Sequence, residues 1–80
     1  MTKDEVIEVI IKNIRENLDD LENEEIDPKK TMKDYGANSL DMIEVVSCSM
    51  RELNIKIPRA ELAEIPNIEA LADKFMEYVE

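Results

Sequence analysis

Histidine is absent from this chain, and its absence excludes several classes of chemistry. Neither a Ser-His-Asp nor a Cys-His catalytic arrangement can be built without it. Histidine-based metal sites and most general acid–base schemes are excluded for the same reason. The acidic stretches also lack the spaced aspartates, glycine and closing glutamate of a calcium loop, so we expect no metal site. Carboxylate chemistry is left, but so small a domain has little space to bury a substrate.

Cysteine, glycine and proline are scarce, with one, one and three residues. The single cysteine, Cys48, cannot form an internal disulfide and is expected to be a small buried or half-buried residue. Few glycines and prolines suit helices joined by short loops. No apolar run is long enough to span a membrane, and no signal peptide is visible because Met1 to Asp4 lead directly into an acidic amphipathic segment. These features predict a cytoplasmic location.

Positive charge is also in short supply. The chain has 10 basic and 20 acidic residues, for a net charge of −10. Such a chain should avoid nucleic acid and anionic membranes and attract basic surfaces of partner proteins, although most of the charges need only solvate helix faces. The hydrophobic fraction of 44% is ordinary for a globular protein, and 80 residues predict a single domain over 1–80.

Helical spacing of apolar residues dominates what is present. Thr2 and Glu5 form a capping-box pair at the start of the first amphipathic segment. We predict an all-α fold, a small four-helix bundle of three longer helices and one short helix, with a long loop over 19–38 between helices 1 and 2. The expected helices run from about Lys3 to between Leu18 and Asp20, from about Leu40 to Leu53, from Arg59 to Ile65, and onward from Asn67 as N-cap.

The apolar stripes of these helices define the expected core. The inner positions are predicted to be Val6, Ile7, Ile10, Ile11, Ile14 and Leu18 in the first helix, Leu40, Ile43, Val46, Met50 and Leu53 in the second, and Ile68, Leu71, Ala72, Phe75 and Val79 in the last. The second stripe should pack on the first helix. Between the helices, Leu21, Ile26, Met32 and Tyr35 should hold the long loop, Ile55 and Ile57 should turn inward, and Leu62 and Ile65 should face a pocket region.

A serine lies where the long loop ends and the second helix begins, in Asp34-Tyr35-Gly36-Ala37-Asn38-Ser39-Leu40-Asp41. Gly36 can adopt backbone angles that other residues resist. Asn38 or Ser39 is a good N-cap, and Asp41 completes a capping-box pattern with Asn38. Ser39 is therefore expected at the mouth of a helix with its hydroxyl exposed, where free N–H groups and the helix dipole favour a phosphate. A serine at a helix start is usually only a cap, so the local pattern permits a phosphodiester without requiring one.

The stretch Gly36-Ala37-Asn38-Ser39-Leu40-Asp41, followed by Ile43-Glu44-Val45-Val46, resembles the prosthetic-group site of acyl carrier proteins. Length, charge and helix layout agree over nearly the whole chain. The resemblance implies 4′-phosphopantetheine esterified to Ser39, with its terminal thiol carrying acyl groups as thioesters. It also implies a cavity between the helices and partner recognition by the second helix, through Asn38, Leu40, Asp41, Met42 and Glu44. Met42 is open to a second interpretation, as a filler at the edge of the core.

One residue departs from the family pattern, because Asn38 stands where an aspartate usually precedes the serine. This removes a negative charge beside the modification site. With Asn38 and Met42, the stretch resembles discrete carriers of polyketide assembly lines, including those of β-branching cassettes. Fatty-acid synthesis is the close alternative, followed by a peptidyl or aminoacyl carrier of a nonribosomal system.

The resemblance implies a carrier and not an enzyme. A phosphopantetheinyl transferase would load Ser39 from coenzyme A. Acyltransferases, ketosynthases or related synthase enzymes with basic docking surfaces would then be partners of a monomeric shuttle. A hypothesis from another class is an unmodified acidic helical module that only binds proteins, which explains the charge and the stripes but leaves Ser39 without a purpose.

Overall fold

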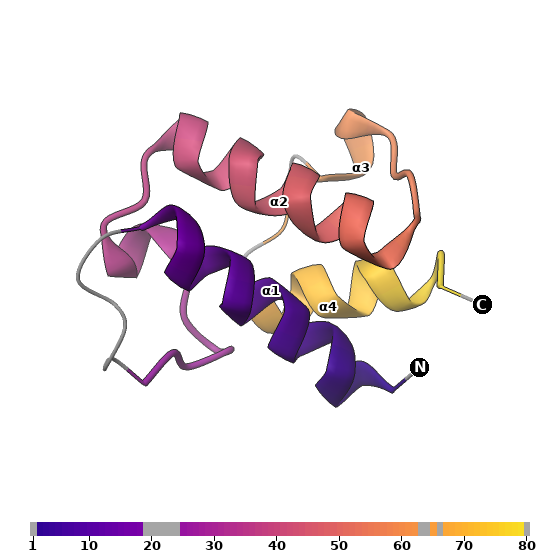
Figure 1. The fold of residues 1–80 in the computed structure, drawn as a ribbon, viewed down its shortest axis with the longest axis horizontal. Coiled ribbons are helices and arrows are strands. Elements are labelled where there is room, and N and C mark those ends of the chain that lie inside the picture. Colours follow the sequence, from indigo (N-terminus) through magenta and orange to yellow (C-terminus); the bar gives the residue numbers. More distant parts are fainter. Residues whose placement is uncertain (1, 19–24, 63–64, 66, 80) are drawn as a thin grey trace.

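The computed structural model describes residues 2–18, 25–62, 65 and 67–79, and within these ranges the chain forms helices and no strand (Figure 1). The elements are α1 (Lys3–Asn17), a 3-10 helix η1 (Met32–Tyr35), α2 (Ser39–Leu53), α3 (Arg59–Leu62) and α4 (Ile68–Met76). The predicted all-α bundle of three longer helices and one short helix is confirmed. Helix α1 ends at Asn17, before the predicted end between Leu18 and Asp20, because Leu18 already has an extended backbone. The predicted contact of Leu21 and the closing Pro66 lie outside the described residues.

The start of α1 is determined by local hydrogen bonds. Thr2 Oγ1 accepts from the Glu5 N–H at 3.2 Å, and Glu5 Oε1 accepts from the Thr2 N–H at 3.0 Å. This reciprocal pair satisfies two amide groups that the first helical turn leaves free, as the sequence predicts. Val6, Ile10 and Ile14, spaced by four residues, are then fully buried on one face of α1.

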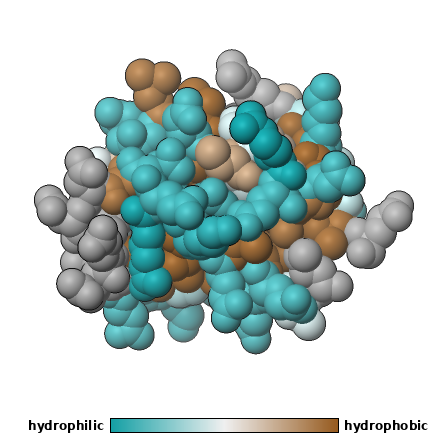
Figure 2. Space-filling view, viewed as in Figure 1, coloured by the Kyte–Doolittle hydropathy of each residue, from teal (hydrophilic) through white to brown (hydrophobic). Residues whose placement is uncertain are grey.

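The core lies where α1 packs against both α2 and α4. Phe75 of α4 is fully buried there, with Ile10 of α1 and Val45 of α2. At the far end of α1, Lys3 Nζ lies 2.8 Å from a carboxylate oxygen of Asp73 and so links α1 to α4. Polar side chains cover most of the face seen in Figure 2, with hydrophobic atoms visible between them. The bundle therefore conceals a mainly aliphatic core beneath a charged surface.

The predicted inner face of α2 is wrong at its first half. Leu40 is 70% exposed and Ile43 44% exposed, whereas Val45 and Ser49 are fully buried. Ser49 can occupy the core because its hydroxyl donates to the carbonyl oxygen of Val45 at 2.7 Å, so its polar group is satisfied within the helix. Because one of these buried positions is a serine, the spacing of apolar residues alone does not identify the buried face of α2.

The segments around α3 match their predictions in part. Ile57 is buried and Ile55 half-buried in an extended connector, as expected. The short helix α3, Arg59–Leu62, has one turn. The sequence predicts two turns over 59–65, of which residues 63–64 lie outside the described ranges.

Asn67 caps α4 as predicted, its Oδ1 accepting from the Ala70 N–H at 2.7 Å. Helix α4 ends at Met76, so Val79 lies beyond it and is half-buried.

Candidate functional site

A short 3-10 helix within the long loop sets the approach to Ser39. It is absent from the sequence predictions, which treat 19–38 as irregular. Thr31 caps η1: its Oγ1 accepts from the Asp34 N–H at 3.3 Å, and Asp34 Oδ2 accepts from the Thr31 N–H at 3.0 Å. Gly36 then ends η1 at φ +90°, a left-handed conformation that glycine adopts without strain. The chain reverses there and enters α2.

The first turn of α2 is capped by Asn38. Its side-chain Oδ1 accepts from the Asp41 N–H at 2.8 Å, and Asp41 Oδ2 accepts from the Asn38 N–H at 3.1 Å. The predicted capping box is confirmed, with Asn38 and not Ser39 as the N-cap. Ser39 is the first residue of α2, one position earlier than the predicted start, and it is exposed. An exposed hydroxyl is thereby held at the positive end of a 15-residue helix.

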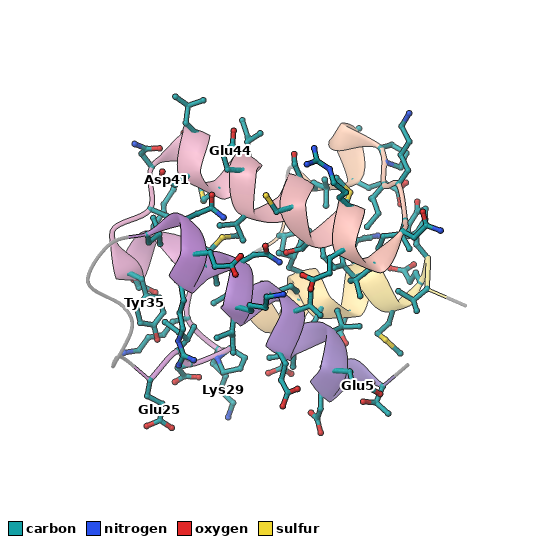
Figure 3. The ribbon with its side chains drawn as sticks, in the orientation of Figure 1. Glu5, Glu25, Lys29, Tyr35, Asp41 and Glu44 are labelled. Atoms are coloured by element: carbon teal, nitrogen blue, oxygen red, sulfur yellow. The ribbon has the colours of Figure 1, made fainter. Side chains whose placement is uncertain are left out.

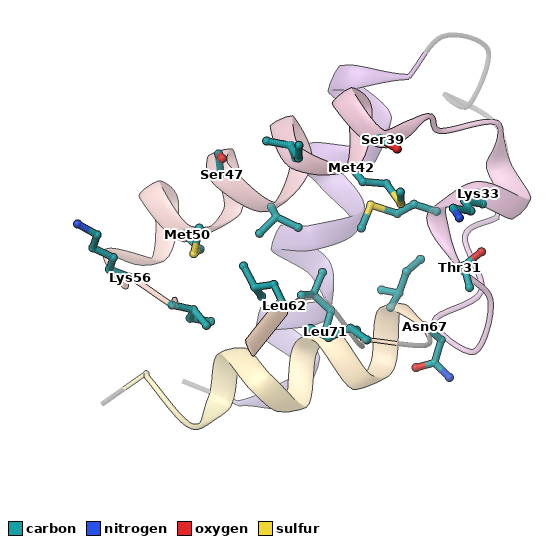
Figure 4. Close-up of a pocket in the computed structure, with 16 residues that line it drawn as sticks. Thr31, Lys33, Ser39, Met42, Ser47, Met50, Lys56, Leu62, Asn67 and Leu71 are labelled. Carbon is teal, nitrogen blue, oxygen red and sulfur yellow. The ribbon is translucent and has the colours of Figure 1, made fainter. Parts of the chain in front are cut away.

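Ser39 lies on the rim of a cavity of about 680 Å³ between α2, η1, α3 and α4 (Figure 4). This volume is within the usual range of sites that hold small organic ligands. The walls are mainly aliphatic and sulfur-containing, with a few polar groups at the edge. The lining residues are Thr31, Met32, Lys33, Ser39, Met42, Ile43, Val46, Ser47, Met50, Lys56, Ile57, Leu62, Ile65, Asn67, Ile68 and Leu71.

The predicted site residues fall into two groups. Asn38, Ser39 and Leu40 are exposed at the start of α2, and Asp41 and Glu44 follow on the same end of that helix (Figure 3). Met42 differs, because it is half-buried, packs against the core and lines the cavity. Leu62 and Ile65 line the cavity too, as predicted. The sequence predictions missed Lys33, whose only signal is a group of three lysines, Lys29, Lys30 and Lys33, in an otherwise acidic chain.

Polar contacts hold α3, one wall of the cavity, against α4. The Tyr78 hydroxyl donates to Glu61 Oε2, and Lys74 Nζ lies 3.5 Å from Glu61 Oε1. The hydrogen bond to Glu61 is the main cause that raises the pKa of Tyr78 above its usual value of 10.0. Lys74 also pairs with Glu77 at 3.2 Å, which is the main cause of its raised pKa. A helix of four residues has little stability alone, so these contacts position it.

Within the described ranges, no group of three or more cysteine and carboxylate side chains is placed to hold a metal ion. In the same ranges, no helix combines the length and the apolar character needed to cross a membrane. An exposed serine at a capped helix start, beside an apolar cavity in a small helical domain, is the arrangement that the resemblance to carrier proteins implies.

Comparison with known proteins agrees with this class. The family model described as "Phosphopantetheine attachment site" matches residues 8–75. The polyketide biosynthesis acyl-carrier-protein AcpK of Bacillus subtilis (strain 168) is 35% identical over 80 residues, which cover 100% of this chain and 98% of that protein. An acyl carrier protein of Wolinella succinogenes is 31% identical over 65 residues, covering 81% of this chain and 80% of that protein.

A solved structure is similar as well. A chain in the crystal structure of the curacin biosynthetic pathway HMG synthase in complex with acetyl donor-ACP superimposes with a TM-score of 0.87 at 37% identity, covering 94% of this chain and 96% of that one. The protein belongs to the acyl carrier family that bears the phosphopantetheine attachment site. It is thus a carrier of acyl groups and not an enzyme, and its cofactor is 4′-phosphopantetheine.

Proposed function

We propose that Ser39 is the residue that bears 4′-phosphopantetheine, and that residues 1–80 act as one monomeric carrier domain in the cytoplasm. The observation that carries the assignment of Ser39 is its position, exposed on the first turn of α2 and on the rim of the cavity. The other described serines of α2 are less suitable. Ser49 is fully buried. Ser47 lies in the middle of the helix, more than one turn from the free amide groups at its start.

The residues around Ser39 fit the group. A phosphodiester on its hydroxyl would lie at a helix N-terminus, where the dipole and unpaired N–H groups favour an anion. The Asp41 carboxylate, which accepts from the Asn38 N–H, is fixed in the capping box close by. When bound, the group supplies a terminal thiol that takes acyl groups as thioesters. The chain itself holds the attachment point, keeps it accessible and offers an apolar cavity beside it.

The start of α2 is the proposed docking surface for partner enzymes. It combines the exposed apolar side chains of Leu40 and Ile43 with the acidic groups of Asp41 and Glu44. Such a surface suits synthase-type enzymes with basic rims around an apolar patch, such as acyltransferases and ketosynthases, and also the transferase that loads Ser39. Asn38 beside Ser39 contributes an amide and no charge. Contacts of this kind are weak and salt-sensitive, so the carrier can release each partner in turn.

The pathway we favour is polyketide biosynthesis, with an acetyl or related small acyl group as cargo in a β-branching step. The relatedness over the full chain to a polyketide biosynthesis acyl-carrier-protein supports this assignment, as does the similarity to a chain in the complex of an HMG synthase with acetyl donor-ACP. Fatty-acid biosynthesis is the second candidate, favoured by a cavity able to receive an aliphatic chain.

Loading with coenzyme A tests the proposal directly. The purified chain is incubated with coenzyme A and a broad-specificity phosphopantetheinyl transferase, and its intact mass is recorded. We expect the mass of one phosphopantetheine to be gained by the natural chain and by Ser47→Ala, and not by Ser39→Ala. Ser47→Ala is the matched control, because Ser47 is also exposed, lies on α2 and lines the same cavity.

Two results would contradict the proposal. One is a gain of mass in Ser39→Ala that is lost in Ser47→Ala, which would move the attachment site. The other is no gain in any variant, while circular dichroism shows a helical fold and a control carrier is loaded in parallel. That second result would favour an acidic module that binds proteins without modification.

A further inference from the structure

Lys33 differs from the other side chains of η1 because it has no partner among the described residues. It is exposed, and within the described part of the chain its amine makes no hydrogen bond or ion pair. The three remaining side chains of η1 are all engaged, one by burial and two by hydrogen bonds to the neighbouring loop: Met32, Asp34 and Tyr35. Among the described contacts, every side chain of η1 except that of the lysine therefore serves the fold.

The turn at Gly36 places Lys33 near Ser39. The Gly36 N–H donates to the Lys33 carbonyl oxygen at 3.0 Å, and the Ala37 N–H donates to the Met32 carbonyl oxygen at 3.2 Å. These bonds close the end of η1 and return the chain toward α2. Lys33 and Ser39 consequently line the same cavity, and Figure 4 shows both at one end, beside Met42.

At this end of the cavity, modification of Ser39 would place negative charges in excess of positive ones. The two nearby carboxylates, of Asp34 and Asp41, each accept a backbone N–H in a capping box. A phosphodiester adds a negative charge to a chain whose net charge is already −10. The other lysine that lines the cavity, Lys56, lies at the opposite end (Figure 4). Lys33 is thus the cation that the cavity wall offers beside the attachment point.

We propose that Lys33 pairs with the phosphodiester on Ser39 and so directs the pantetheine arm across Met42 toward the cavity. The inference rests on the proposed function of Ser39. Lys33 acts as a positioning residue, through the anionic anchor of the arm. Because the pair is exposed, its effect on the populations of arm orientations should be about twofold to fivefold. A bias of this size favours sheltering of the arm while leaving it free to reach a partner.

The test uses the loaded protein. The natural chain, Lys33→Gln, Lys33→Arg and Lys29→Gln are each converted with coenzyme A and the transferase, and intact mass verifies the loading. Lys29→Gln is the matched control, because Lys29 is exposed, precedes η1 and points away from α2 in Figure 3, while the change in net charge is the same. Phosphorus NMR at low and high salt then reports the environment of the phosphodiester. Proton NOEs between the pantetheine dimethyl group and the Met42 methyl group report the position of the arm.

We expect Lys33→Gln to shift the phosphorus resonance, to remove its salt dependence and to weaken the NOEs to Met42 about twofold to fivefold. Lys33→Arg and Lys29→Gln should resemble the natural chain. Normal loading with unchanged spectra in Lys33→Gln would overturn this inference alone, as would an equal change in Lys29→Gln. Failure of loading in every variant would overturn the proposed function of Ser39 and this inference with it.

Discussion

Asn38 shows how one side chain serves the fold and the site together. It caps α2 through the 2.8 Å hydrogen bond from the Asp41 N–H to its Oδ1, and it directly precedes Ser39. An amide provides the acceptor that a cap requires without adding a charge beside the proposed attachment point. The capping role is therefore separable from the charge that partner enzymes would meet at this position.

This separation gives a prediction at the residue scale. Asn38→Ala should lower the free energy of unfolding by about 1 kcal/mol, because an amide group of the first helical turn loses its partner. Asn38→Asp keeps an acceptor oxygen and should retain most of the stability. Urea denaturation followed by circular dichroism measures both. An alanine variant as stable as the natural chain would show that water replaces the cap at no cost.

At the scale of elements, the Glu52 carboxylate of α2 makes polar contacts with two side chains of α1. Glu52 of α2 lies with Oε1 2.7 Å from Lys12 Nζ and with Oε2 3.1 Å from Asn13 Nδ2. Asn13 is buried, and its amide also donates to the Val9 carbonyl oxygen at 2.9 Å. The hydrogen bond from Lys12, followed by that from Asn13, lowers the pKa of Glu52 below its ordinary value of 4.5.

A pH-dependent difference between variants follows from this shift. Because the pKa of Glu52 is lower in the folded chain, its stabilising effect is complete above about pH 4.5 and is lost as pH falls through the folded value. Glu52→Gln should therefore be less stable than the natural chain at pH 7, and the difference should be smaller at pH 3. Urea unfolding at the two pH values measures the difference. Glu8→Gln removes the same charge from an exposed position on α1 and is the control. A gap in Glu52→Gln that is as large at pH 3 as at pH 7 would contradict the account.

At the scale of the whole molecule, negative charge opposes compaction. The chain has 20 acidic and 10 basic residues, for a net charge of −10. Lys3, Lys12 and Lys74 form ion pairs with some of the carboxylates. Exposed pairs of this kind contribute little each, whereas the excess of like charge acts over the entire surface. The folded state should therefore be sensitive to the ionic strength of the solvent.

We predict that the melting temperature rises when NaCl is added at pH 7, because screening weakens the repulsion among the excess carboxylates. Thermal unfolding monitored by circular dichroism at low and physiological salt measures the change. KCl at the same concentration should act equally if ionic strength is the cause. A fall in melting temperature with salt would mean that the ion pairs outweigh the general repulsion.

Local interactions explain why much of the molecule could be predicted from its sequence. The caps at Thr2, Asn38 and Asn67 each join residues three positions apart, so their partners are visible in a short stretch. Helical spacing likewise identifies the buried rows of α1 and α4. The position of Ser39 at a helix start belongs to this group, because a glycine, a cap and an apolar repeat define it.

Contacts between distant residues explain what could not be predicted. The loop around η1 is held to the start of α4 by hydrogen bonds from the Ile68 N–H to the Lys30 carbonyl oxygen, at 3.1 Å, and from the Glu69 N–H to that of Pro28, at 2.7 Å. Partners about forty residues apart leave no local signal. The rotation of α2 has the same origin, because packing against α1 buries Val45 and Ser49 and leaves Leu40 exposed.

The sequence by itself determined the all-α fold, the starts of the helices to within a residue, the absence of histidine chemistry and the exposed serine at the start of α2. These follow from composition, caps and periodicity, which act within one or two helical turns. Only the tertiary structure decided which side of α2 faces the core, where the cavity opens and that Lys33 lies at the Ser39 end of it. Those features depend on how the helices dock, since each residue turns a helix by about 100° and only packing between helices selects the buried side.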